Sequence, residues 1–141
     1  MLSEAQQQEI IAAIKQAETR TSGEIRVHIE EKSPSPLDPI ARAKEVFAKL
    51  EMHKTAQRNA VLFFIALEAR KFAIWGDDGI NKVVPADFWD TTRDAMRQHF
   101  RQDDLVAGLR TGIEMAGKQL KAYFPYQSED RNELPDDISF Q

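Results

Sequence analysis

The stretch 59–80, NAVLFFIALEARKFAIWGDDGI, contains two apolar segments separated by a short polar connection. The first segment, 60–67, is nearly unbroken and rich in branched and aromatic residues, which is typical of a strand covered on both faces. The second segment, 72–75, follows so closely that the two predict an antiparallel hairpin. The hairpin leads directly into 76–80, where Asp77 and Asp78 lie together between two glycines.

Amphipathic patterns on either side of this hairpin predict four helices and one further strand. The alternation of Ile25, Val27 and Ile29 predicts a half-covered strand over 24–30. The third helix is expected over about 88–101. The residues expected to cap the four helices are Ser3 (with Gln6 in a capping box), Asp38, Asp87, and Asp103 or Asp104. The predicted buried stripe of the second helix consists of Ile40, Ala43, Phe47 and Leu50.

The order helix, strand, helix, strand, strand, helix, helix predicts an α/β fold. We expect a three-layer α/β/α sandwich in which a small mixed sheet is flanked by about four helices. The strands 24–30 and 60–67 flank a helix and should be parallel, whereas the third strand runs back against the second. Residues 1–125 are predicted to form a single domain. Residues 126–141 form an acidic tail that docks either on its own domain or on a partner.

The overall composition is that of a globular protein and excludes several functional classes. The net charge of −4 argues against a nucleic-acid partner, and the absence of cysteine excludes disulfides and thiolate metal sites. No apolar run reaches the 18 residues or so that a membrane-spanning helix needs. The first residues have neither the basic start nor the apolar run of a signal peptide, so we expect a cytoplasmic protein.

The predicted topology brings polar residues from three segments to one edge of the sheet. Asp77 and Asp78 leave the third strand at this edge, where Glu24 enters the first strand. Asn59 enters the second strand there, next to Arg58, which either is a solvated residue at the strand entry or balances the carboxylates. Carboxylate and amide oxygens are the ligands that Ca²⁺ and Mg²⁺ take in proteins. Asp77, Asp78, Glu24 and Asn59 are therefore candidate ligands for a divalent cation.

The same residues have a second interpretation. Asp-Asp-Gly after a strand is most often a turn, in which the carboxylates accept hydrogen bonds from nearby backbone amides. The spacing is not that of an EF-hand, because the repeated acidic alternation and the distal glutamate are missing. Both interpretations, the turn and the metal or anion site, stay open at the level of sequence.

Other catalytic and metal-binding patterns are missing from the sequence. The three histidines are isolated, so a zinc site is not indicated. There is no Gly-x-Ser-x-Gly elbow and no glycine-rich phosphate loop. No nucleophile or general base stands out, and the sequence does not decide whether the protein is an enzyme.

Several short motifs taken together resemble the TPM domain family, in its short bacterial form without a membrane anchor. They occur in order over essentially the whole chain, and they include TSGEIRV at 21–27, KFAIWGDDGI at 71–80, FWD at 88–90, YFP at 123–125 and NELPD at 132–136. The resemblance implies a sheet sandwiched by helices. In the family pattern the aspartate falls at Asp77, whereas Asp78 occupies a variable position.

The proteins of the family that this chain resembles have several unrelated functions, so the resemblance does not imply a single one. Relatives in photosynthetic membranes are described as acid phosphatases connected with photosystem repair, and bacterial relatives look like binders of divalent cations. An animal relative acts as an auxiliary receptor subunit. We therefore expect a protein that binds Ca²⁺ or Mg²⁺, with metal-dependent phosphatase activity in which Arg58 helps hold the phosphoryl oxygens. The alternative is a non-catalytic module that assists the assembly or repair of a membrane-protein complex.

Overall fold

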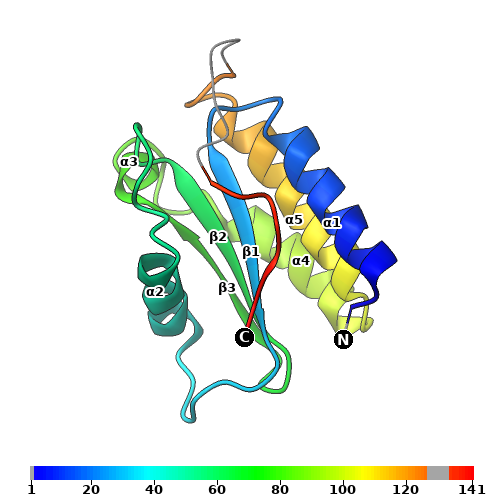
Figure 1. Ribbon diagram of the computed structural model, residues 1–141. Helices are drawn as coiled ribbons and strands as arrows, with labels where there is room; N and C mark the ends of the chain where they lie inside the picture. Colours follow the sequence, from blue (N-terminus) through cyan, green and yellow to red (C-terminus); the bar gives the residue numbers. More distant parts are fainter. Residues whose placement is uncertain (1, 127–133) are drawn as a thin grey trace. The chain divides into compact units, whose positions relative to one another are not determined.

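The computed structural model describes residues 2–126 and 134–141, which fall into two compact units. The sheet unit comprises Glu24–Lys82 and Asn132–Gln141, and the helical unit comprises Met1–Gly23 and Val83–Arg131. Within the described residues the chain forms one sheet and five helices, in the order that Figure 1 traces. This confirms an α/β fold with a mixed sheet.

The sheet unit is built on β2 (Ala60–Ala66), which is buried along its whole length. It pairs in parallel with β1 (Glu24–Glu30) and antiparallel with β3 (Lys71–Gly76), so the predicted hairpin and the predicted parallel pair are both confirmed. A two-residue strand, β4 (Ser139–Phe140), pairs in parallel with the other edge of β1, giving the order β3-β2-β1-β4. A short helix, α3 (Asp78–Asn81), follows β3 directly.

Helix α2 (Pro39–Lys49) packs against β2 and β3 within this unit. Asp38 caps it as predicted, with its carboxylate accepting hydrogen bonds from the first backbone amides of the helix. Val46 and Phe47 belong to the core cluster of the unit, and burying each contributes about 1.5–3 kcal/mol. The predicted stripe is wrong at one position: the side chain of Ile40 is 46% exposed, whereas Arg42 is buried.

Strand β1 was expected to be covered on one face only, and the structure shows that this is wrong. Glu24, His28 and Glu30 are buried as well as the alternating apolar residues. Charged and polar side chains become buried only where they find partners, and His28 and Glu30 have them in α2 and β4. An alternating sequence therefore forms a strand that is buried on both faces.

The described part of the acidic tail lies against the sheet unit. Leu134 joins the core cluster around α2 and β2, and Ile138 is also buried. Beside β4, the backbone amide of Gln141 donates a hydrogen bond to the carbonyl of Ile29 at 3.0 Å. Residues 134–141 thus dock on the unit that contains β1. The segment 127–133 lies outside the described residues.

The helical unit contains α1 (Glu4–Ala17), α4 (Asp90–Arg101) and α5 (Leu105–Leu120). The predicted capping box is present, with Ser3 and Gln6 each accepting a hydrogen bond from the backbone amide of the other. Asp104 caps α5. The helix predicted over about 88–101 is confirmed as α4, but its predicted cap is wrong, because the helix begins after Trp89 without a side-chain cap and Asp87 lies outside it. Asp87 lies instead inside the turn 86–89 that precedes the helix.

Two glycines let α4 and α5 approach closely within this unit. A Cβ atom on Gly108 would meet the ring of Phe100, and one on Gly112 would meet the side chain of Met96. Both neighbours belong to α4. Close helix packing is therefore the role of these glycines.

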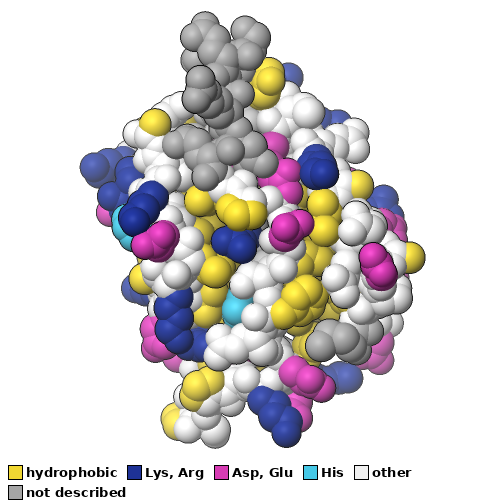
Figure 2. Space-filling view, in the orientation of Figure 1, with side chains coloured by type: hydrophobic (Ala, Val, Ile, Leu, Met, Phe, Trp, Pro, Cys, Tyr) yellow, Lys and Arg dark blue, Asp and Glu magenta, His cyan; other side chains and the backbone are white. Residues whose placement is uncertain are grey.

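In Figure 2, Lys and Arg side chains of the described residues are seen together with Asp and Glu side chains on the surface. Among the described residues, no helix is long and apolar enough to cross a membrane.

Candidate functional site

Three chain segments meet at one end of the sheet unit, as the topology predicts. The backbone amide of Glu24 donates to the carbonyl of Asn59 at 3.3 Å, which places the start of β1 beside the residue that precedes β2. The amide of Asp77 donates to the carbonyl of Ala60 at 3.0 Å. The amide of Gly79 donates to the carbonyl of Arg58 at 2.9 Å. The candidate ligands Glu24, Asn59, Asp77 and Asp78 therefore lie on three segments whose backbones are hydrogen-bonded to one another at this end of the sheet.

Asp77 is the best-defined member of this cluster. Its carboxylate faces Arg58, whose Nε lies 2.7 Å from Oδ2 and whose Nη2 lies 2.9 Å from Oδ1. Oδ1 also accepts a hydrogen bond from the amide of Asp78 at 2.8 Å, so that Asp77 caps α3. Hydrogen bonding to Asp77 raises the pKa of Arg58 above its ordinary value. Of the two roles expected for Arg58, the geometry favours that of counter-ion.

The other three candidate ligands differ in exposure. The side chain of Asp78 is 70% exposed, and its Oδ2 lies 3.7 Å from Nη2 of Arg58. Asp77 and Asp78 thus share one guanidinium group. Glu24 and Asn59 are buried, and the amide of Asn59 donates to the hydroxyl of Thr55 at 3.3 Å. Both buried residues make interactions of their own within the structure.

The backbone that carries Arg58 is held in an uncommon conformation. Its φ is 51°, in the left-handed region, which costs a non-glycine residue roughly 1 kcal/mol. A Cβ atom on Gly79 would lie 2.5 Å from the carbonyl oxygen of Arg58 and would also meet that of Gln57. Glycine at position 79 therefore lets α3 approach the 57–58 backbone closely enough for Asp77 to meet Arg58.

The residues at this edge fit a divalent cation in part. Within the described ranges, no group of three or more histidine, cysteine, aspartate or glutamate side chains is arranged to hold a metal. However, Asp77 and Asp78 already share a positive group, and Asp78 is open to solvent. Carboxylate oxygens completed by water are an ordinary environment for Ca²⁺ or Mg²⁺. Of the four candidate ligands, Asp78 is therefore the one whose carboxylate is open to solvent.

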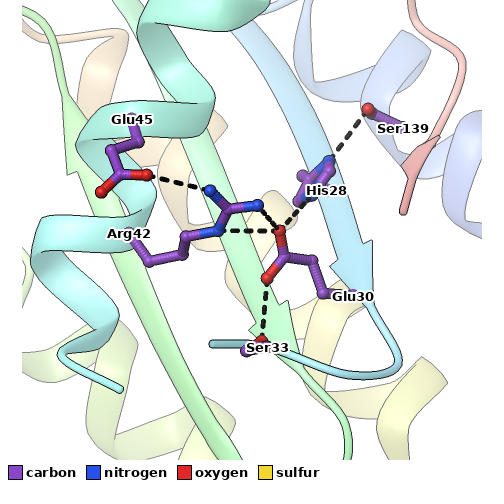
Figure 3. Close-up of polar contacts among 6 residues, drawn as sticks. All are labelled: His28, Glu30, Ser33, Arg42, Glu45 and Ser139. Carbon is purple, nitrogen blue, oxygen red and sulfur yellow. Dashed lines mark hydrogen bonds and ion pairs between the residues drawn. The ribbon is translucent and has the colours of Figure 1, made fainter. Parts of the chain in front are cut away.

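A second polar cluster lies elsewhere in the sheet unit and was not predicted (Figure 3). Nε and Nη2 of Arg42 donate to one oxygen of Glu30, at 2.9 and 2.5 Å, and the hydroxyl of Ser33 donates to the other at 2.8 Å. His28 joins the cluster through Nε2, which lies 3.3 Å from Glu30, and through Nδ1, which lies 2.9 Å from the hydroxyl of Ser139. The cluster therefore links β1, α2 and β4.

Burial and hydrogen bonding fix the protonation of this cluster. Burial alone would raise the pKa of Glu30, but the hydrogen bonds from its three partners outweigh it and hold this pKa below its ordinary value. Burial lowers the pKa of His28, against the hydrogen bond and charge of Glu30. An ionised Glu30 only accepts, so we assign the imidazole proton to Nε2 and the acceptor role to Nδ1, which receives the hydroxyl of Ser139.

Comparison with known proteins identifies the family to which this fold belongs. The model of the TPM domain family matches residues 1–119. The chain belongs to the TPM domain family. No curated protein sequence matches this TPM domain. Its relatives with solved structures include the BA42 protein of the psychrophilic bacterium Bizionia argentinensis, which is 46% identical with a TM-score of 0.94. That comparison covers 100% of this chain and 96% of BA42.

Two more distant structures share the fold of this TPM domain. The N-terminal domain of the cg2496 protein from Corynebacterium glutamicum is 18% identical with a TM-score of 0.68, over 96% of this chain and 84% of that domain. The N-terminal domain of a protein from P. gingivalis is 18% identical with a TM-score of 0.67, over 91% of this chain and 83% of that domain. At this level of identity the similarity establishes the fold alone.

Proposed function

We propose that this TPM domain binds a divalent cation, Ca²⁺ or Mg²⁺, at the turn between β3 and α3. The observation that carries the proposal is that Asp77 and Asp78 share the single guanidinium group of Arg58. One positive charge between two carboxylates leaves net negative charge at a solvent-open position, and ligand charge is what a divalent cation requires. Glu24 and Asn59 are the further candidate ligands, from the starts of the neighbouring strands.

The chemistry that such a cation supplies is Lewis-acid activation and orientation of a phosphoryl group. Arg58 would contribute hydrogen-bond donors to phosphoryl oxygens, for which its planar fork is suited. The residues on this edge include no nucleophile or general base to which we assign a role. Phosphatase activity therefore ranks below cation binding in this proposal.

Titration of ¹⁵N-labelled protein with Ca²⁺ and with Mg²⁺ tests the binding. We expect saturable shifts of the backbone amides of residues 76–80, and their loss in Asp77→Asn. Glu68→Gln is the matched control, because it removes one negative charge from an exposed position in the β2–β3 connection. Unmoved amides at 76–80 in the wild type would rule out the site.

Melting curves provide an independent test. A cation that binds only the folded state raises the melting temperature by mass action. We expect this increase in the wild type and in Glu68→Gln, but not in Asp77→Asn. If Ca²⁺ leaves the wild type unchanged and Asp77→Asn melts lower with and without the ion, Asp77 serves only as a helix cap and as the partner of Arg58.

A second candidate function is that of an interaction module, and an aromatic cluster in the helical unit favours it. The rings of Phe88 and Trp89 meet edge to face at 4.7 Å, and those of Phe88 and Tyr123 at 5.6 Å. Tyr123 is nevertheless 39% exposed. Packed aromatic side chains that stay accessible are typical anchors of protein interfaces.

Site-specific photocrosslinking in cells tests this second function. A photoreactive residue at position 123 should yield a discrete product with a membrane protein, whereas one at the exposed position 118 on α5 should not. The same products from both positions, or none from position 123, would contradict it.

A further inference from the structure

Strand β1 carries a row of charged and polar side chains on the face that also meets α2. Arg26, His28 and Glu30 alternate along the strand and therefore project to the same face of the sheet. On this face Nε of Arg42, from α2, donates to Glu30. Charges at a largely buried face need partners there, because water does not supply them. The groups that lie opposite this row therefore indicate what kind of segment the face accommodates.

Residues 134–141, called here the tail segment, cover this face and the adjoining edge of β1. Leu134 packs in the core cluster of the unit, and the hydroxyl of Ser139 lies 2.9 Å from Nδ1 of His28 (Figure 3). The amide of Gln141 donates to a carbonyl of β1 at 3.0 Å. An apolar anchor, a polar side-chain contact and backbone hydrogen bonds to a strand edge are the contacts by which extended peptides bind to sheets. The tail segment therefore occupies this face in the way that a bound peptide would.

The tail segment leaves one buried polar group of the face without a hydrogen bond. Among the described residues, Nε of Arg26 is buried and has no hydrogen-bond partner. Burial lowers the pKa of Arg26, and the charge of Asp137 offsets this effect only in part. A buried donor without an acceptor is destabilising, and a carboxylate that reached it would form a charge-assisted hydrogen bond. The tail segment is therefore an imperfect occupant at Arg26.

The strand pairing of the tail segment is also short. β4 pairs with two of the seven residues of β1. Continuing its register would bring residue 137 opposite Arg26, but residues 134–138 do not form a strand. Pro135 has no N–H group to donate, and aspartate is depleted in strands, which explains why the pairing stops. A segment with strand-forming residues at these places would pair with more of β1.

We propose that this face of β1 is a docking site for an extended segment of another protein, which displaces the tail segment and adds a longer strand to the sheet. The partner segment carries strand-forming residues where the tail segment has Pro135 and Asp136, and a carboxylate that reaches Nε of Arg26. The tail segment of a second copy of this chain has the same sequence and would repair neither defect. This docking site does not depend on the proposed cation site.

The tail segment competes with such a partner because it belongs to the same chain. A tethered occupant acts at a high effective concentration. The apparent affinity of the partner is therefore reduced by the fraction of molecules in which the face is open. Weakening the attachment of the tail segment should strengthen partner binding.

The first test measures binding of a fluorescent synthetic peptide to the full chain. The probe is the tail sequence LPDDISFQ with the changes Pro135→Val, Asp136→Thr and Asp137→Glu. Leu134→Asp in the protein releases the tail segment, because a charge is not tolerated in the apolar core cluster. This variant should bind the probe at least about tenfold more tightly than the wild type. Tyr126→Asp adds the same charge at an exposed position and, as the matched control, should stay within about twofold of the wild type.

The second test is a double-mutant cycle between the probe and Arg26. Replacing the glutamate of the probe by glutamine should weaken its binding to Leu134→Asp about three- to tenfold. When Leu134→Asp is combined with Arg26→Gln, the same replacement should change the affinity by less than about twofold. Arg20→Gln is the control, because Arg20 is also half-buried but belongs to the helical unit. With this control substitution the full loss should remain.

The third test measures displacement in the wild-type protein. A saturating concentration of the probe should accelerate hydrogen exchange of the Gln141 amide, because its bond to the carbonyl of Ile29 is lost. The unmodified peptide LPDDISFQ at the same concentration should have a smaller effect. If Leu134→Asp does not fold, this measurement decides alone.

Several results would overturn the docking site. Failure of the probe to bind the wild type and Leu134→Asp would do so, as would binding that leaves the Gln141 amide protected. Equal affinities of the probe and the unmodified peptide would show that strand formation and the carboxylate are not recognised. A wild-type dimer in light scattering that Leu134→Asp dissociates would show that the occupant is the tail segment of a second copy.

Discussion

Arg42 donates two hydrogen bonds to one carboxylate oxygen of Glu30, from Nε at 2.9 Å and from Nη2 at 2.5 Å. The side chain of Glu30 is fully buried and that of Arg42 is 7% exposed. Removing one partner of a buried pair leaves the other charge without compensation in a place that water does not reach. The position of α2 on the sheet therefore depends on this buried carboxylate as well as on the apolar packing of Val46 and Phe47.

Replacement of Glu30 tests this dependence. Glu30→Gln should lower the free energy of unfolding by about 3 kcal/mol, measured by urea denaturation. Glu45→Gln is the control, because Glu45 contacts the same Arg42 at 3.0 Å but has a side chain that is 63% exposed. It should change stability by less than about 0.5 kcal/mol. Equal effects of the two substitutions would mean that burial of the pair does not decide its contribution.

Acid should destabilise the protein in two stages, and His28 governs the first. Burial lowers the pKa of His28 in the folded state, so between this value and 6.5 the unfolded chain binds more protons. Stability is therefore lost as the pH falls below about 6.5. His28→Gln should flatten the dependence of the urea midpoint on pH in this window. His53→Gln, at an exposed position, is the control for the loss of an imidazole.

Protonation of Glu30 causes the second stage of acid destabilisation. Its pKa is held below 4.5 in the folded state, so its contribution is present above pH 4.5 and is lost as the pH falls through the folded value. The Glu30→Gln protein should lack this second loss. Constant stability of the wild type between pH 6.5 and pH 4.5 would contradict the first stage, and constant stability below pH 4.5 would contradict the second.

Gly79 should tolerate no side chain. A Cβ atom there meets backbone carbonyl groups of residues 57 and 58, which do not move aside as a side chain does. Gly79→Ala should lower the free energy of unfolding by about 1–3 kcal/mol. Lys82→Ala, at the exposed end of α3, is the control and should have a small effect. A Gly79→Ala protein as stable as the wild type would show that α3 need not approach Arg58 so closely.

The two glycines between α4 and α5 should respond differently to alanine. Gly108 faces the ring of Phe100, whereas Gly112 faces the flexible side chain of Met96. Alanine also favours a helix over glycine by about 1 kcal/mol, which opposes the steric cost. Gly108→Ala should therefore destabilise the protein by about 1–2 kcal/mol, and Gly112→Ala should be near neutral. The reverse order in thermal melting would contradict the packing.

Elements that depend on local sequence were predicted from it. The bounds of β1 follow from alternation, and the caps Ser3, Asp38 and Asp104 follow from their own short motifs. The topology predicted that Asp77 and Arg58 lie at the same edge, because the end of β3 and the start of β2 meet there, but it left open whether they pair.

Features that depend on distant partners were not predicted. In the sequence Glu30 has the pattern of the polar end of a strand, whereas in the structure a hydrogen bond from Arg42, 12 residues away, helps to compensate its burial. The same contact explains why Arg42 is buried while Ile40 is exposed on the same helix. His28 seemed isolated because Ser139 lies 111 residues further along the chain. None of these pairings leaves a spacing that sequence reasoning can detect.

The pairing of β4 with β1 also constrains how the protein is made. Three strands of the sheet are complete once residue 76 has been synthesised, but the partner of His28 is residue 139. At ribosomal rates the sixty or so intervening residues take roughly 3 to 12 seconds to produce. For that interval one edge of β1 has no strand beside it and the core around α2 lacks Leu134. The nascent chain therefore presents an open β-edge during this period, and an open edge is a site at which strands of other chains can pair.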